Sequence, residues 1–418
     1  MLIVQENHTF DTYFGRYCQA ASGSNPTCTN GPNCCEAAPA SEPKGATPLR
    51  LDDDSSNAAA NFAVDRNHTF ACEIQQINDG KMDGYVTGSN GTGPCFGPNC
   101  ASRYNWAIAD RASVGAYWSL ADGNALADRY FQPVVGSTSS NNMYFAIAHF
   151  QFLDNSVLPT TIGTGCTDPT GICLDGAKMS YQGRTTVADL LLGAGKTFAT
   201  YADGYAEAKS AAPSCPSAPS TCPYASCFAH PVACHGCIYD PADIPFAYYI
   251  QLGDAHIRDY AELKVDLASG RLPNFSFVKA RAYRNEHPNL STIGDGVSFV
   301  TDTIAAVEGS SYADSTLILL TWDEGGGFFD HVAPPTGVDR DGQNKIVPYG
   351  TRVPLLAIGR FARKGAVSHV QMEHSSIVRF LEYNFLGPVG QLGYNDAKVN
   401  NIGSLLDPNA TAVRIPEQ

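Results

Sequence analysis

The chain has 418 residues, of which 44% are hydrophobic and 16% are charged, so it has enough apolar mass for a sizeable core and is not a disordered chain. Its formal net charge of −14 at pH 7 repels phosphate backbones, which argues against DNA or RNA as a partner. No run of about 18 apolar residues occurs, so the sequence predicts no transmembrane helix.

Regular structure is predicted from the first residues onward. Residues 2–5 form an apolar run typical of a buried strand, and no signal peptide precedes it, so we expect the natural chain to begin further upstream. The elements that follow in the first half are an irregular Cys-rich insertion at about 19–60, helices at 106–131 and 140–152, a helix that begins within 186–192, a strand at 197–201, and a second Cys-rich insertion at about 205–240.

Strands and helices alternate in the second half of the chain. The predicted order is a strand at 274–278, a helix at 298–307, strands at 315–322 and 353–359, and a helix at 375–385. Continuous apolar strands that alternate with helices favour an α/β fold, a three-layer α/β/α sandwich around a mostly parallel central sheet. We expect one catalytic domain over residues 1–418.

The cysteines indicate where the protein works. There are 14, all at or before Cys237, and they lie in loop-like segments rich in Gly, Pro, Ser and Asn. This pattern predicts disulfides that staple long loops in an oxidising compartment, so we expect a secreted or periplasmic protein. The alternative is a zinc site made by Cys222, Cys227, Cys234 and Cys237 with His235.

Two acidic pairs follow predicted strands that are far apart in the sequence. Glu6 and Asn7 come directly after the first strand, and Asp323 and Glu324 come after the strand at 315–322. Ligands of parallel sheets bind beyond the carboxyl ends of the strands, and hard divalent cations prefer carboxylate and amide oxygens. The four residues therefore predict a metal site; the alternative is that each pair caps a helix or lies in solvent.

Two long motifs add a family resemblance. ENHTFDTYFG at residues 6–15 and DEGGGFFDHVAPP at residues 323–335 resemble the signatures of the phosphoesterase family, and the short blocks at 80–84, 286–288 and 373–376 match in the same order. This family holds bacterial phospholipases C, plant non-specific phospholipases C and bacterial acid phosphatases. It belongs to the alkaline phosphatase-like superfamily, so the resemblance implies the same α/β/α sandwich.

The resemblance also implies a nucleophile. Alignment of GSTSSNNMY at residues 136–144 with the family's third signature places Thr138 at the attacking position, with Ser137 and Ser139 as the neighbours that a shift of one residue would select. Asn141 is then expected to donate a hydrogen bond to a phosphate oxygen. A turn before a helix suits an anion because its backbone N–H groups are free, but the same Ser/Thr cluster could simply cap the helix.

The remaining implied roles belong to the metal and to two histidines. The resemblance implies one or more divalent ions, of which Ca²⁺, Mg²⁺, Mn²⁺ and Zn²⁺ all remain open, held by the two acidic pairs and activating Thr138 to form a covalent phospho-threonine. His68 and His287 are expected to bind the phosphoryl group or to protonate the leaving oxygen, with His287 the better general acid. His331, inside the second acidic motif, is expected to support the metal site.

Two departures from the family pattern bear on the substrate. Asn142 and Ser140 stand where the third signature has Arg and Pro, and residues 242–244 replace a histidine pair that many relatives carry before Pro-Phe-x-Tyr.

Three functions remain open. The first is phospholipase C activity on phospholipid diesters, with peripheral membrane contact and no protein partner implied. The second is an acid phosphatase acting on phosphomonoesters. The third is an inactive, disulfide-rich binding protein on the same scaffold.

Overall fold

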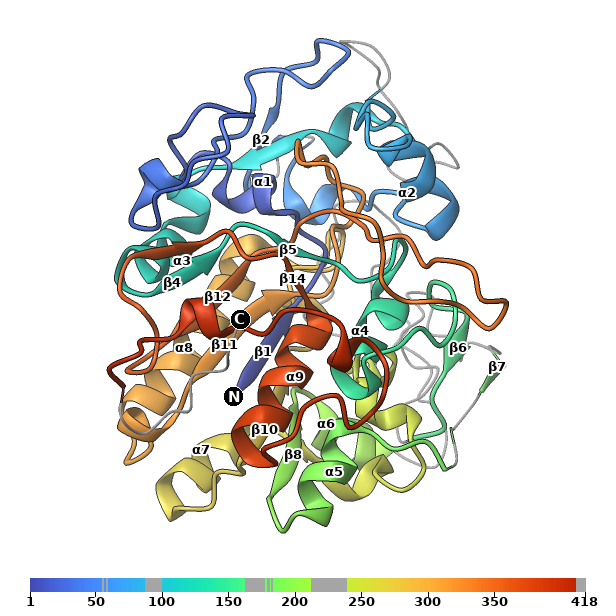
Figure 1. Ribbon diagram of the computed structural model, residues 1–418, viewed down its shortest axis with the longest axis vertical. Helices are drawn as coiled ribbons and strands as arrows, with labels where there is room; N and C mark the ends of the chain where they lie inside the picture. Colours follow the sequence, from blue (N-terminus) through green and yellow to red (C-terminus); the bar gives the residue numbers. More distant parts are fainter. Residues whose placement is uncertain are drawn as a thin grey trace.

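The computed structural model describes residues 1–54, 56–57, 59–86, 100–161, 177–178, 181, 183–211 and 239–410 (Figure 1). An eight-stranded sheet forms its centre, in the order β13-β4-β12-β11-β1-β10-β8-β9. The strands are β1 (Leu2–Gln5), β4 (Ala125–Ala127), β8 (Phe198–Ala202), β9 (Ile257–Asp259), β10 (Phe275–Lys279), β11 (Ile318–Trp322), β12 (Leu355–Ile358) and β13 (Ala366–Ser368). Within this sheet only the two pairings of β12 are antiparallel, so the predicted mostly parallel sheet is confirmed.

The first strand lies in the middle of this sheet. Ile3 pairs with Val278 of β10 on one side and with Leu320 of β11 on the other, and all four residues of β1 are buried. A central parallel strand is covered on both faces, so it reads as an unbroken apolar run instead of an alternating one. This placement puts residues 6 and 7 at the carboxyl end of the sheet, next to the end of β11.

Helices cover both faces, as the predicted three-layer sandwich requires. Figure 1 shows α4, α5 and α9 on one side of the sheet and α3, α7 and α8 on the other, and the helices pack within these two groups. Their bounds are α3 (Arg111–Gly123), α4 (Thr138–Ile147), α5 (Val187–Gly193), α7 (Tyr260–Ser269), α8 (Ile293–Glu308) and α9 (His374–Phe385).

The long helix predicted at 106–131 is wrong at both ends. α3 accounts for its middle only, and the flanking residues form β3 (Ala107–Ala109), β4 and β5 (Tyr130–Phe131), which pairs with β14 (Met372–Glu373). Short alanine-rich strands on either side of a helix give the same apolar spacing as a longer helix, so periodicity alone did not separate them.

The first Cys-rich insertion is stapled as predicted. Disulfides join Cys18 to Cys35 and Cys28 to Cys34, and a third joins Cys72, on α2 (Phe70–Ile77), to Cys100. The insertion also contains β2 (Leu49–Leu51), which pairs with β3. The second insertion begins with a regular helix, α6 (Tyr205–Ala211), and the alternative zinc-site cysteines lie outside the described residues.

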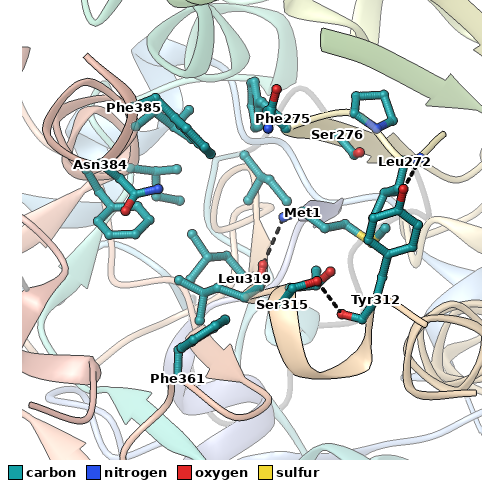
Figure 2. A pocket seen from close by; sticks show the side chains of 18 residues that line it. Met1, Leu272, Phe275, Ser276, Tyr312, Ser315, Leu319, Phe361, Asn384 and Phe385 are labelled. Atoms are coloured by element: carbon teal, nitrogen blue, oxygen red, sulfur yellow. Dashed lines mark hydrogen bonds between the residues drawn. The ribbon is translucent and has the colours of Figure 1, made fainter. Parts of the chain in front are cut away.

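The two ends of the sheet differ in chemistry. Beside the first residues of β1, β10 and β11 lies a cavity of about 340 Å³, whose lining includes Phe275, Phe380 and Phe385 and contains no carboxylate, histidine or cysteine (Figure 2). The charged motif residues lie at the other end, where β1 and β11 finish. Among the helices in the described ranges, none combines the length and hydropathy needed to cross a bilayer.

Candidate active site

The two acidic pairs meet at the carboxyl ends of β1 and β11. Gln5 and Trp322 are the paired last residues of these parallel strands, so Glu6-Asn7 and Asp323-Glu324 leave the sheet side by side. The backbone N–H of Asn7 donates to Asp323 Oδ1 at 3.0 Å. All four side chains are buried. We call these four residues, which supply three carboxylates and the amide of Asn7, the acidic quartet.

The glycines of the second motif allow this close approach. Gly326 has a φ of 63°, and a β-carbon there would collide with the backbone of Asn7, which itself has a φ of 64°. The backbone N–H of Gly326 also donates to Glu324 Oε2. Glycine adopts this left-handed conformation without steric cost, so the Gly-rich stretch fits tightly around the quartet.

Three oxygens of the quartet are left without partners. Among the residues that the structure describes, none donates a hydrogen bond to Asn7 Oδ1, Asp323 Oδ2 or Glu324 Oε1, although all three atoms are buried. Burial, reinforced by the Asp323 carboxylate, raises the pKa of Glu324 well above its usual range, and burial raises that of Asp323 to about 6. Buried unsatisfied oxygens cost about 1–3 kcal/mol each, and a divalent cation would remove that cost. This donor set therefore fits a hard metal ion.

Glu6 differs from the rest of the quartet because the protein supplies it with a cation. Lys279 Nζ lies 2.7 Å from Glu6 Oε1, and Asn285 Nδ2 donates to the same oxygen at 2.7 Å. Burial opposes ionisation, but the ammonium of Lys279 holds the pKa of Glu6 at about 2. Sequence reasoning missed Lys279, although a lysine that ends the apolar strand β10 beside the quartet's strands was a usable signal.

His68 and His287 present the same ring atom to the site. Each Nδ1 lies within hydrogen-bonding distance of a backbone carbonyl, that of Arg66 at 2.7 Å and that of Pro288 at 2.6 Å. A carbonyl only accepts, so Nδ1 carries the hydrogen in both rings, and His68 Nε2 accepts from Asn7 Nδ2 at 3.4 Å. His68 Nε2 lies 3.7 Å from Glu324 Oε1.

Asp65 belongs to the same group of side chains. Ligand atoms of Asp65, His68 and His287 all lie within 4.8 Å of one another. Burial opposes protonation of His287, but the carboxylates of Asp65 and Glu6 raise its pKa above the usual value. A histidine with this shift keeps its proton to higher pH, which suits a general acid or a ligand for a phosphate oxygen.

Thr138 is the first residue of α4, and three backbone N–H groups around it donate to acidic and amide side chains, so they are not free for an anion as expected. Gly136 N–H donates to Glu73 Oε2 at 2.7 Å, Ser137 N–H to Asp154 Oδ1 at 3.1 Å, and Ser139 N–H to Asn155 Oδ1 at 2.8 Å. Ser137 occupies the N-cap position, yet its side chain makes no capping hydrogen bond. The helix cap suggested by the Ser/Thr cluster is therefore not what these hydroxyls provide.

Gln132 connects this turn to the quartet. Its Oε1 accepts the backbone N–H of Gly325 at 2.8 Å, and its Nε2 donates to Glu73 Oε2 at 2.9 Å. Glu73 in turn accepts from Gly136, so one hydrogen-bond chain links the end of β11 with the residues that precede Thr138. Ser137 Oγ also reaches the backbone oxygen of His68 at 3.5 Å. Hydrogen bonds therefore connect the segments that carry the predicted nucleophile, metal ligands and His68.

Comparison with known proteins agrees with this arrangement. A sequence model of the Phosphoesterase family matches residues 1–386. The chain belongs to the phosphoesterase family. This confirms the resemblance carried by the motifs and identifies the protein as a phosphoric ester hydrolase.

Several curated relatives of this phosphoesterase are named phospholipase C. It is 24% identical to Phospholipase C B of Mycobacterium tuberculosis over 97% of this chain and 76% of that protein. It is 30% identical to Non-hemolytic phospholipase C of Pseudomonas aeruginosa over 29% of this chain and only 21% of that protein. It is 33% identical to Non-specific phospholipase C1 of Arabidopsis thaliana over 28% of this chain and 26% of that protein. The aligned part thus spans between about a fifth and three quarters of these relatives.

Solved structures add little to the family match. A protein of the alkaline phosphatase superfamily from Vibrio parahaemolyticus overlaps with a TM-score of 0.33 at 10% identity, over 64% of this chain and 59% of that one. An overlap this low carries no weight beside the sequence family.

The side chain of Asn141, in the phosphoesterase's third signature, makes contacts other than the expected one to phosphate. The amide of Asn141 donates to the backbone oxygens of Gly136 and Ser137 and accepts from Val134 N–H, so it is already engaged in holding the turn. Asn142, which stands where the signature has Arg, is buried, and neither polar atom of its amide finds a partner in the described part of the chain. His331, which was expected to support the metal site, is paired with Asp11 and Glu36.

Proposed function

We propose that this phosphoesterase is a metal-dependent phospholipase C that cleaves phospholipid diesters through a phospho-threonine on Thr138. The observation that supports this most directly is the set of three unpartnered buried oxygens, linked through Gln132 to the turn before Thr138. The relatives named phospholipase C support phospholipid diesters as the substrate class. The disulfides favour a secreted or periplasmic enzyme.

The chain's own residues divide the chemistry among them. Asn7, Asp323 and Glu324, with Glu6 beside them, would hold a divalent cation that acts as a Lewis acid toward the phosphoryl group and lowers the pKa of the attacking hydroxyl. Thr138 Oγ1 releases its proton to solvent and forms a bond to phosphorus as the bond to the diacylglycerol oxygen breaks, and His287 Nε2 supplies the proton that this oxygen takes up. Water then attacks the phospho-threonine and returns a proton to His287 Nε2. The bond from phosphorus to Thr138 Oγ1 breaks, Oγ1 takes a proton from solvent, and the phosphorylated headgroup leaves. His68 Nε2 and Asn141 are the remaining candidates for contact with the phosphate oxygens. Asn141 can take that role only if it gives up a hydrogen bond to the turn.

The test compares two chromogenic substrates, p-nitrophenylphosphorylcholine for diesters and p-nitrophenyl phosphate for monoesters, with and without chelator. We expect diester turnover that needs metal and that falls at least about 1,000-fold in Thr138→Ala, because no other group replaces the nucleophile. Ser139→Ala is the matched control and is expected to keep most of the activity.

Each other outcome has a meaning. Monoester turnover alone would identify an acid phosphatase with the same machinery. Full metal-dependent activity in Thr138→Ala would exclude this nucleophile and transfer the test to Ser137 and Ser139. A wild-type chain that neither binds a divalent ion nor turns over either substrate would support an inactive scaffold.

A further inference from the structure

One buried carboxylate lies next to predicted active-site residues in the sequence, and none of the predicted metal or phosphate ligands is among the donors to its side chain. Glu286 is fully buried, and four donors surround its side chain. Oε2 accepts from Tyr13 Oη at 2.7 Å and from Trp322 Nε1 at 2.8 Å. Oε1 accepts from Tyr117 Oη and from Gln5 Nε2 at 3.3 Å. All four donors are neutral groups, so this carboxylate is satisfied by aimed hydrogen bonds and not by a salt bridge.

Glu286 and two of its partners directly precede predicted active-site residues in the sequence. Gln5 immediately precedes Glu6, Trp322 immediately precedes Asp323, and Glu286 itself immediately precedes His287. Gln5 and Trp322 end the adjacent strands β1 and β11, and Glu286 follows β10, the neighbour of β1 on its other side. The carboxylate thus joins the three segments that carry the quartet and the candidate general acid.

The backbone around Glu286 is adapted to this placement. Glu286 has a φ of 73°, which is costly for a residue with a side chain. Its carbonyl accepts from Asn61 Nδ2 at 2.8 Å, and Gly296 packs against its side chain so closely that a β-carbon there would collide with it. Strain of this kind persists where the surrounding contacts over-determine it, and it is often found at functional sites.

We propose that Glu286 is a positioning residue, which fixes the ends of β1 and β11 and the loop of His287 in one arrangement suited to metal binding and proton transfer. The proposal rests on the proposed function for the roles of the quartet and His287. It predicts that loosening the hydrogen bonds to Glu286 weakens metal binding and slows turnover without changing which substrate is bound.

The test is Glu286→Gln, whose size matches glutamate. In either orientation the NH₂ group faces one tyrosine hydroxyl, which can rotate to accept, and one N–H donor, Trp322 Nε1 or Gln5 Nε2, which cannot, so at least one of the four hydrogen bonds is lost. The matched control is Glu382→Gln on α9, where a carboxylate that is also fully buried accepts backbone N–H groups of Gly390 and Gln391 at 2.7 and 3.1 Å, away from the quartet. Three readouts are compared: kcat and KM for p-nitrophenylphosphorylcholine, the divalent-ion Kd by calorimetry without substrate, and urea unfolding.

We expect Glu286→Gln to lower kcat by about 10–100-fold and to weaken ion binding by about 10-fold, the usual cost of losing a group that orients metal ligands, with KM within about twofold. Glu382→Gln is expected to keep wild-type kcat and Kd. Folded Glu286→Gln with wild-type kcat and Kd would overturn the proposal, and so would equal losses in Glu382→Gln.

A second variant covers the case in which Glu286→Gln does not fold. Tyr13→Phe with Tyr117→Phe removes two donors and keeps the carboxylate, and the same losses in kcat and ion affinity are expected on a smaller scale. Wild-type values in this double variant would count against the proposal. Failure of the proposed function shows separately, as wild-type inactivity or an active Thr138→Ala, while the calorimetric Kd still reports on Glu286.

Discussion

The same two sequence motifs build two buried charge clusters that are satisfied in opposite ways. The first is the acidic quartet, from the beginning of each motif. The second, which we call the charge clamp, consists of Asp11, Asp330, His331, Arg352 and Glu36. In the clamp Arg352 bonds Asp330 at 2.9 Å and Asp11 at 3.1 Å, and His331 bonds Asp11 at 2.8 Å and Glu36 at 2.9 Å. In the quartet three oxygens have no donor.

The carboxylates of the clamp are neutralised by protein cations and stabilise the fold, whereas the unpaired oxygens of the quartet are available to bind a ligand. Asp11, Asp330 and His331 are close enough to hold a metal ion, but Arg352 already supplies the positive charge there. A buried charge without its partner is strongly destabilising. A protein therefore keeps unpaired buried carboxylates only where something else neutralises them. Removing the Arg352 guanidinium should therefore destabilise the fold. Removing a carboxylate of the quartet should leave the protein folded but unable to bind metal.

The largest stability effect is expected at Arg352, which is fully buried and also stacks on the Phe10 ring at 4.5 Å. Arg352→Met keeps most of the side-chain volume and leaves Asp11 and Asp330 without their guanidinium. We expect the free energy of unfolding to fall by about 3–5 kcal/mol, measured by urea unfolding. The folded fraction should keep a wild-type Kd for divalent ions. A variant as stable as wild type would show that the clamp does not need this charge.

Glu324→Gln tests the quartet and is expected to affect stability less than Arg352→Met does. Burial raises the pKa of Glu324 well above its usual range, which favours the neutral form without metal, so glutamine is expected to change stability little. Wild type should gain about 2.7 kcal/mol at a metal concentration of 100 times Kd, and the variant much less. Turnover in Glu324→Gln should fall as its affinity for metal falls.

The matched control for Glu324→Gln comes from the clamp. Glu36→Gln is expected to lose stability at every metal concentration and to keep the metal-dependent gain, since Glu36 contacts His331 and Arg129 and no quartet residue. Full metal-dependent stabilisation in Glu324→Gln would place the cation elsewhere, with the Asp65-His68-His287 group as the next candidate.

The contrast also shows what could be predicted from the sequence. The quartet was found because each pair follows an apolar strand, and strand ends converge in a parallel sheet. The contacts of Lys279, Gln132, Glu286 and Arg352 were not found, because they span long sequence separations. Lys279 ends an apolar strand and Glu286 lies in the block 286–288, but neither signal identifies the partner. Asn141 shows the converse: a motif predicted its position, but only the structure shows that its amide is held by the turn.

The smallest expected effect is a change in pH dependence at His331. Nδ1 faces Asp11 and Nε2 faces Glu36, and both partners accept, so the ring carries both hydrogens and a positive charge. Burial opposes protonation, but the Asp11 carboxylate raises the pKa of His331 above the usual value, with Arg352 acting against it. A pKa raised on folding contributes stability that is complete below the unfolded value of about 6.5 and is lost as pH rises through the folded value.

Wild type is therefore expected to lose unfolding free energy as the pH rises above about 6.5, a loss that His331→Gln does not show, since each unit by which folding raises a pKa corresponds to about 1.4 kcal/mol. Urea unfolding at stepped pH, with metal removed, measures both curves. His369→Gln is the control: the Asp128 carboxylate beside it also raises the pKa of His369, but this ring is more exposed, so water screens the pair and a smaller difference follows. Parallel wild-type and His331→Gln curves would mean that His331 is neutral in the folded clamp. Arg352 would then be the cation that holds the two motifs together.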